Sequence, residues 1–253
     1  MSFVRLIPVL TLKDGRMIKT IQFDQYRDVG HPRTMGKVYD SQDVDELVFL
    51  DITATQENRA PDYESIQMFA EECAMPLTIG GGVKSRDIIR ELLNIGADKV
   101  VINSEAVRRP EFITEAANSF GSQCIVVSID AKRYSGSGYE VLIDGGYERT
   151  GLEVVEWAKE VERRGAGEIM ITAIDREGTM EGYDLDLIRS VQDAVSIPVI
   201  ANGGAGLLVD LLDLIKETDA TAVACSSLFL FTDNKPIKVK SFLQTGRVPV
   251  RPI

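Results

Sequence analysis

Short, almost continuously apolar segments alternate along the chain with longer segments in which apolar residues recur at helical spacing. Runs that are apolar nearly throughout are typical of strands buried on both faces of a parallel sheet. They predict eight strands, near residues 4–11, 46–52, 76–80, 98–103, 124–130, 168–174, 197–202 and 221–226. The helices predicted to follow them lie near residues 34–43, 62–74, 85–95, 109–119, 151–165, 185–194, 207–217 and 234–244.

Eight strand–helix units in 253 residues fit a closed α/β barrel, the (β/α)8 fold, better than an open doubly wound sheet. No proline-rich linker, charge block or low-complexity tract divides the chain, so we predict a single domain over residues 1–253. Barrels of this kind carry their chemistry at the carboxyl ends of the strands. Functional residues are therefore expected at those strand ends.

The second half of the chain repeats the first at an offset of roughly 120 residues. Met75–Gly82 returns as Ile197–Gly204, and Asn103-Ser104 returns as Ser226-Ser227. A repeat of half the chain predicts a barrel built from two similar halves, with matched features on opposite sides of its mouth.

Glycines and small polar residues at the matched strand ends predict two facing anion sites. Glycine lets a backbone N–H approach an oxyanion, and a helix N-terminus adds partial positive charge. Two matched copies disfavour the alternative that these glycines only close tight turns. We therefore expect a ligand with a phosphate at each end. The residues concerned are Gly81, Gly82, Asn103, Ser104, Gly203, Gly204, Ser226 and Ser227.

The same repeat sets Asp130 opposite position 11, because Ile7–Lys13 corresponds to Val126–Lys132. Two carboxylates facing each other there could give and take a proton. Position 11 is Thr11, however, whose hydroxyl forms hydrogen bonds but holds no proton in reserve near neutral pH. A strand-end cap is the alternative role for Asp130.

The formal net charge of −11 argues against nucleic acid or an anionic membrane as a partner, while leaving room for a phosphorylated small molecule. Cys73, Cys124 and Cys225 are scattered in apolar segments, as expected for reduced thiols of a cytoplasmic protein. The apolar run at the start is too short for a signal peptide or a membrane span. No Cys/His cluster has metal-ligand spacing, so we predict neither metal nor cofactor.

Seven motifs are specific to one family: Lys13–Arg16, Asp45–Ala54, Ile79–Gly82, Phe120–Gln123, Asp130–Arg133, Asp175–Thr179 and Gly182–Asp184. With them the chain resembles, over essentially its whole length, the cyclase subunit of imidazole glycerol phosphate synthase. The resemblance implies an enzyme that binds a substrate with two phosphates, and it places Lys19, Glu177 and Gly178 at that substrate. The two catalytic aspartates of the family fall on Asp130 and on Thr11.

The resemblance also implies a glutaminase that docks at the N-terminal face of the barrel and sends ammonia up its centre. The residues at the ammonia entrance correspond to Arg5, Glu46, Lys99 and Glu168. Each is a charge at the start of an apolar strand, where a barrel core favours branched aliphatic residues. Two cations and two anions can pair as a closed ring, which reduces the cost of burying them. Solvent-exposed charges are the alternative.

Two segments, Leu10–Thr20 and Ser226–Phe231, look more like a paralogous branch of the family. That branch accompanies a glutaminase and a sugar amidotransferase in making acetamidino groups on surface-polysaccharide sugars. We therefore expect a paralogue of the cyclase family, a synthase- or lyase-type subunit of a glutamine amidotransferase complex that receives ammonia and serves acetamidino formation on a surface-polysaccharide nucleotide sugar. A genuine histidine-pathway cyclase and a non-catalytic scaffold that activates a glutaminase are the two alternatives.

Overall fold

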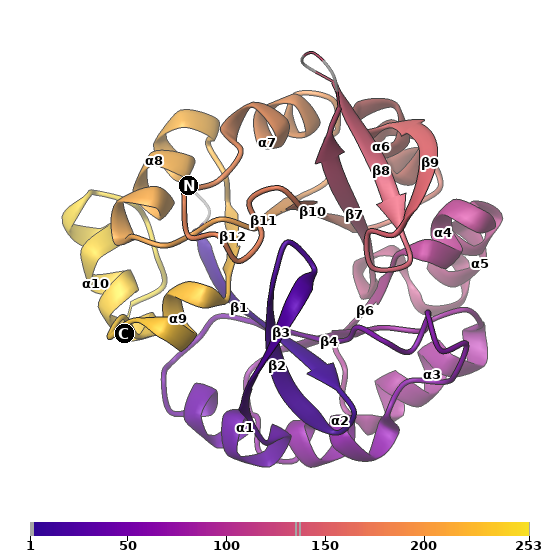
Figure 1. Cartoon of the computed structure of the whole chain (residues 1–253), viewed down its shortest axis with the longest axis horizontal. Coiled ribbons are helices and arrows are strands. Elements are labelled where there is room, and N and C mark those ends of the chain that lie inside the picture. Colours follow the sequence, from indigo (N-terminus) through magenta and orange to yellow (C-terminus); the bar gives the residue numbers. More distant parts are fainter. Residues whose placement is uncertain (1–2, 135, 137, 253) are drawn as a thin grey trace.

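The computed structural model describes residues 3–134, 136 and 138–252, so both ends of the predicted domain 1–253 lie outside the described residues. Within them, eight parallel strands surround a common axis (Figure 1). The strands are β1 (Arg5–Lys13), β4 (Leu47–Asp51), β5 (Leu77–Gly80), β6 (Lys99–Ile102), β7 (Ile125–Arg133), β10 (Glu168–Ala173), β11 (Val199–Asn202) and β12 (Ala222–Cys225).

Every barrel strand is hydrogen-bonded to two neighbours, which closes the sheet. The closing contact is the parallel pairing of β7 with β10, where Asp130 lies opposite Thr172. On the other side β1 joins β12 to β4. The (β/α)8, or TIM, barrel predicted from the apolar pattern is therefore confirmed.

Amphipathic helices cover the outside of the barrel: α1 (Pro32–Asp40), α2 (Tyr63–Ala70), α3 (Arg86–Ile95), α5 (Glu111–Phe120), α6 (Val154–Arg163), α7 (Leu185–Gln192), α8 (Leu208–Thr218) and α10 (Pro236–Thr245). Two five-residue helices, α4 (Ser104–Arg108) and α9 (Ser227–Phe231), follow β6 and β12 directly. The single helix predicted at 109–119 is therefore wrong at its start. Pro110 disfavours helical backbone at Arg109 and separates α4 from α5.

Two β-hairpins rise beyond the barrel, and the apolar pattern missed both. The first consists of β2 (Arg16–Ile21) and β3 (Asp24–Gly30), and the second of β8 (Tyr139–Ile143) and β9 (Glu148–Glu153). They follow β1 and β7, the strands that the half-repeat equates. The predicted helix at 151–165 overlaps β9 and begins only at Val154.

The turn into β2 carries a recognisable sequence signal. Asp14 and Gly15 both have positive φ, 50° and 69°, and Lys13 pairs with Arg16 across them. An Asp-Gly pair between two strands is the preferred sequence for this type of two-residue hairpin turn. Lys19, which the family resemblance places at the substrate, lies in strand β2 of this hairpin.

The core has two layers. Most buried apolar side chains pack between the strands and the helices. A smaller cluster fills the inside of the barrel and comprises Ile7, Val9, Val48, Val101, Val126, Met170, Ile200, Ala222 and Ala224. The axis of the barrel is thus apolar in its middle section and polar at its two ends.

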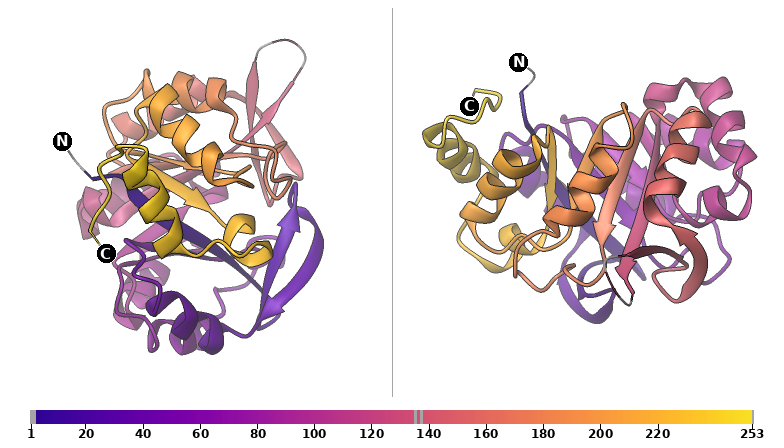
Figure 2. Two further views of the ribbon diagram at one scale, coloured as in Figure 1. Left: turned by 90° about the vertical axis from the view of Figure 1, so that its left-hand side faces the viewer. Right: turned by 90° about the horizontal axis from the view of Figure 1, so that it is seen from above.

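The hairpins and the chain ends lie on opposite sides of the barrel (Figure 2). Near the ends, Val4 forms a parallel bridge with Val250, beside the N-terminal face. The described residues include no helix long and apolar enough to cross a membrane.

One lysine on helix α10 is completely buried. Lys240 Nζ lies 2.5 Å from the carbonyl oxygen of Asp43 and 2.9 Å from Oδ1 of Asp45, in the segment that leads into β4. Asp45 also accepts a hydrogen bond from the backbone N–H of Leu6 at the start of β1. The last helix is thereby fixed to the first strands of the barrel.

Lys240→Ala should lower the free energy of unfolding by about 3 kcal/mol, because removing one partner of a buried ion pair leaves the other charge uncompensated. Urea unfolding followed by circular dichroism would measure the loss. Lys238→Ala, at an exposed position on the same helix, is the matched control and should change stability by less than about 0.5 kcal/mol. Equal stability of both variants would contradict the structural role of the buried lysine.

Candidate functional site

A pocket opens at the C-terminal end of the barrel, beneath the two hairpins. Most of the residues predicted to form the site line it: Thr11, Lys19, Gly81, Gly82, Asn103, Ser104, Asp130, Glu177 and Ser226. Four predicted residues do not line the pocket: Gly178, Gly203, Gly204 and Ser227. Gly178, Gly203 and Ser227 each directly follow a lining residue, and Gly204 follows Gly203.

Asp130, at the mouth end of β7, is the buried carboxylate of the pocket. Asn103 Nδ2 donates a hydrogen bond to its Oδ2 at 2.8 Å, and Ser128 Oγ lies 3.5 Å from Oδ1. Burial raises the pKa of Asp130 to about 6, against the opposing effect of these two donors. A carboxyl group with such a pKa can both accept and release a proton near neutral pH.

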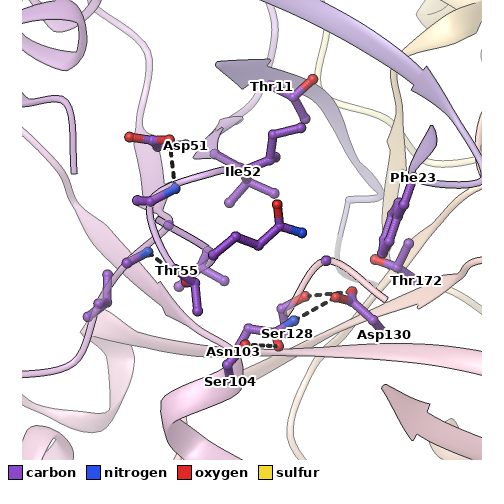
Figure 3. Close-up of a pocket in the computed structure, with 18 of the residues that line it drawn as sticks. Thr11, Phe23, Asp51, Ile52, Thr55, Asn103, Ser104, Ser128, Asp130 and Thr172 are labelled. Carbon is purple, nitrogen blue, oxygen red and sulfur yellow. Dashed lines mark hydrogen bonds between the residues drawn. The ribbon is translucent and has the colours of Figure 1, made fainter. Parts of the chain in front are cut away.

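Thr11 lies across the open space of the pocket from Asp130 (Figure 3). Its hydroxyl donates a 2.6 Å hydrogen bond to the carbonyl oxygen of Ile18 on β2. The hydroxyl proton is therefore committed to the backbone, and what remains towards a ligand is a hydrogen-bond acceptor. Asp130 has no titratable partner at the position related to it by the half-repeat.

Lys19 and Glu177 form a buried ion pair that ties the first hairpin to the barrel. Glu177 also accepts hydrogen bonds from Thr20 Oγ1 at 3.1 Å and from the backbone N–H of Phe23 at 3.3 Å. Burial lowers the pKa of Lys19 to about 8, and the adjacent carboxylate acts in the opposite direction. Through these contacts Phe23 is held at the pocket, which it lines together with Asp130 (Figure 3).

The first-half end of the pocket is bounded by the loop after β5 and the start of α4. Gly81 has a φ of 107°, and a Cβ there would collide with the carbonyl oxygen of Asp51, so only glycine fits. The N–H of Gly82 points to Thr55 Oγ1 at 3.3 Å, and Ser104 Oγ accepts a 3.0 Å hydrogen bond from the N–H of Asp144.

The second-half end also has two glycines with positive φ, and it contains an unpaired hydroxyl. Gly203 and Gly204 again have positive φ, 94° and 118°. Among the described residues, the buried Ser227 Oγ has no hydrogen-bond partner. An unpaired buried hydroxyl is costly in a finished core but suits a position that a ligand oxygen completes.

Sequence reasoning missed several residues of the pocket wall. Arg59 binds Asp51 through both ends of its guanidinium, at 2.6 and 2.9 Å, and fixes the loop after β4. Phe23 and Tyr26 come from the hairpin that the apolar pattern did not detect, and Arg108 comes from α4. The Asp14-Gly15 turn signal would have brought the first two into view.

The four strand-start charges form a closed ring at the N-terminal end of the barrel. Arg5 pairs with Glu46 at 2.7 Å and with Glu168, and Lys99 bridges the same two carboxylates at 3.0 and 2.9 Å. Burial pushes the pKa of Glu46 upward, but Lys99, Thr78 and Arg5 outweigh it and leave that pKa below its ordinary value. Glu46 is therefore ionised at neutral pH, as is Arg5, whose pKa its two carboxylate partners raise against the effect of burial.

The ring and the pocket are joined by the apolar interior of the barrel. Ile7, Val48, Val126 and Met170 belong to this interior cluster, and Met170 also lines the pocket. This interior, filled by apolar side chains, disfavours ions and presents little to hold water. Within the described residues, no cluster of three or more His, Cys, Asp or Glu side chains is placed to hold a metal ion.

A closed parallel barrel with polar residues at its C-terminal end and a charged ring at its N-terminal end belongs to the class of barrel enzymes. Comparison with protein families identifies the family within that class. The model of the family described as histidine biosynthesis protein matches residues 5–234. The chain belongs to this family, whose members are isomerases and cyclases of the TIM-barrel type.

The raised pKa of Asp130 predicts a pH-dependent gain in stability for Asp130→Asn. Ionised Asp130 is disfavoured in the folded state, so its penalty is absent below about pH 4, grows up to about pH 6 and then stays constant. The asparagine variant should be more stable than the parent by about 3 kcal/mol at pH 8 and equal to it at pH 4.

Urea unfolding at several pH values would test this expectation. Asp213→Asn, at an exposed position on α8, removes the same charge without any burial and should show no such pH dependence. A constant difference between Asp130→Asn and the parent from pH 4 to pH 8 would contradict an elevated pKa at Asp130.

Proposed function

We propose that this barrel receives ammonia from a partner glutaminase at its N-terminal face and delivers it to a phosphorylated ligand in the pocket. The observation that carries the proposal is the closed ring of Arg5, Glu46, Lys99 and Glu168 beneath an apolar lumen. A structural core gains little from two buried carboxylates paired with two partly buried cations. A closed ring of paired charges suits a gate that excludes water and ions and opens for a small neutral molecule.

In the pocket, Asp130 is the proposed proton donor and acceptor, because its pKa near 6 suits both roles. Lys19 and the glycine-containing strand ends are the proposed contacts to the ligand phosphate. Glu177 positions Lys19 and keeps the first hairpin over the pocket.

Thr11 supports the paralogous branch over the histidine-pathway cyclase. A threonine that donates to the backbone of Ile18 cannot take part in proton exchange with Asp130. We therefore propose that the barrel serves ammonia-dependent amidation, the formation of an acetamidino group on a surface-polysaccharide nucleotide sugar, together with a sugar amidotransferase.

The second candidate is the cyclase subunit of imidazole glycerol phosphate synthase itself. The family match over residues 5–234 and the presence of both Asp130 and Lys19 favour it. Complementation separates the two: a strain lacking the histidine cyclase should fail to grow without histidine when it carries this chain. Growth would overturn the choice of the paralogous branch in favour of the cyclase.

Thr11→Asp should raise turnover of the histidine-pathway substrate with free ammonium, because it restores the facing acid–base pair. A positioned acid or base contributes about 10²–10⁴-fold, so the gain lies well above the detection limit of a kinetic assay. Thr11→Asn introduces a side chain similar in size to that of Thr11→Asp but without an exchangeable carboxyl proton. It should therefore give no gain in turnover. Rapid turnover by the unmodified chain would remove the reason for proposing a paralogue.

Lys99→Glu should uncouple the two nitrogen sources. The ring would then hold three negative charges and one positive charge. Repulsion among its three carboxylates would open the ring and admit water. Product formation from glutamine should fall by tenfold or more, while product formation from added ammonium should stay near the parental rate. Both rates are measured with the cognate glutaminase present.

Lys216→Glu, an equal charge change at an exposed position on α8, controls for net charge and should leave both rates unaltered. Equal loss with both nitrogen sources would indicate a folding defect in Lys99→Glu. No loss with either source would show that the ring does not gate ammonia.

A further inference from the structure

The two ends of the pocket differ in charge. Arg59, Lys84 and Arg108 line the first-half end, on the segments that follow β4, β5 and β6. The second-half end is lined by Thr172, Asn202 and Ser226, and there the lining Lys19 is already ion-paired with Glu177. In a chain with a net charge of −11, three basic side chains at one end of a pocket mark the place where an anion is attracted.

Two of these basic groups are open to a ligand. Arg59 is fully engaged by Asp51 and Glu57 and belongs to the loop framework. Lys84 donates a 2.8 Å hydrogen bond to Asn58 Oδ1 and forms no ion pair with any described residue. Arg108 pairs with Asp144 and Glu148, both through Nη2.

The two acidic partners of Arg108 orient it without saturating it. Its Nε and Nη1 groups donate no hydrogen bond to any described residue, although a guanidinium carries five N–H donors in a planar fork. Both two-donor edges of the guanidinium include Nη2, which Asp144 and Glu148 occupy, so a phosphate oxygen can accept a single hydrogen bond from Nε or from Nη1.

Two aromatic side chains lie beside the basic end of the pocket. Tyr26 on β3 lines the pocket and is 42% exposed, and Tyr147 on the turn between β8 and β9 is 68% exposed. The neighbouring Tyr26 raises the pKa of Tyr147. Lys13 Nζ stands 3.9 Å from the centroid of the Tyr26 ring and covers one of its faces.

The aromatic pair and the basic groups share one turn of the chain. Asp144, which holds Arg108, is three residues from Tyr147 on the β8–β9 turn, and Gly145 between them lines the pocket. Phe23 packs against Gly146 of the same turn, so the two hairpins meet above the pocket. The turn that holds Arg108 through Asp144 therefore also carries Tyr147, which stands outside the lining of the pocket.

We propose that the first-half end of the mouth is a subsite for a nucleoside diphosphate. Its diphosphate would lie on Lys84 and on the single free donors of Arg108, Nε and Nη1, and its base would stack on Tyr147 and Tyr26. Base stacking on aromatic side chains and basic groups on phosphates are the two terms from which proteins build binding to nucleotides. The proposal specifies the phosphorylated ligand of the proposed function and rests on it in that respect.

Isothermal titration of the barrel without any glutaminase tests this subsite. The ligands are UDP and ADP, compared with pyrophosphate and with uridine. At least one nucleoside diphosphate should bind about tenfold or more tightly than pyrophosphate, because stacking adds to the phosphate contacts. If neither binds more tightly than pyrophosphate, the aromatic part of the subsite is refuted.

Two variants separate the contributions. Tyr147→Ala should weaken the nucleoside diphosphate about tenfold and leave pyrophosphate unchanged, whereas Arg108→Gln should weaken both about tenfold or more. Tyr134→Ala and Arg149→Gln are the matched controls, since both residues are exposed on the second hairpin and its approach, outside this pocket. Variants that behave like their controls would overturn the proposal.

The result is independent of ammonia transfer. Failure of nucleotide binding with intact glutamine-dependent synthesis would refute the subsite alone. Nucleotide binding without any glutamine-dependent synthesis would support the subsite and contradict the proposed delivery of ammonia.

Discussion

The proposed function of this barrel depends on the mutual neutralisation of four charges at its N-terminal end. Arg5, Glu46, Lys99 and Glu168 would each be costly to bury alone, and as an alternating ring they satisfy one another. Thr78 adds a 2.6 Å hydrogen bond to Glu46. The ring shuts the N-terminal end, so the apolar lumen above it is protected from solvent.

The same exclusion of water shapes the other end of the barrel. Asp130 has its pKa raised to about 6 because it is buried at the upper edge of this lumen. The ion pair of Lys19 with Glu177 fastens the first hairpin above it, and the second hairpin meets the first at Phe23 and Gly146. A small neutral molecule that passes the ring would therefore reach the carboxyl group of Asp130 beneath the two hairpins.

The barrel and much of the pocket could be predicted from the sequence, because strands buried on both faces are apolar throughout and the half-repeat pairs their ends. The hairpins could not be predicted in this way. Strand β3 is exposed along most of its length, so no apolar run marks it, and its turn uses Gln22 and Phe23 at positive φ where glycine is usual. The pocket residues missed, Phe23, Tyr26 and Arg108, depend on hairpins or on a short helix for their positions. Which groups remain free to bind a ligand was likewise beyond the sequence, because Arg59 and Arg108 differ only in their partners.

Passage of ammonia through the lumen can be measured most directly by isotope competition. The complete complex would be supplied with amide-¹⁵N glutamine in the presence of excess unlabelled ammonium, and the ¹⁵N content of the product determined by mass spectrometry. A sealed route from ring to pocket predicts product that is almost fully labelled, because nitrogen released by the glutaminase never mixes with the solvent. Label diluted to the isotopic ratio of the bulk solution would show that ammonia reaches the pocket from outside, and would contradict the account.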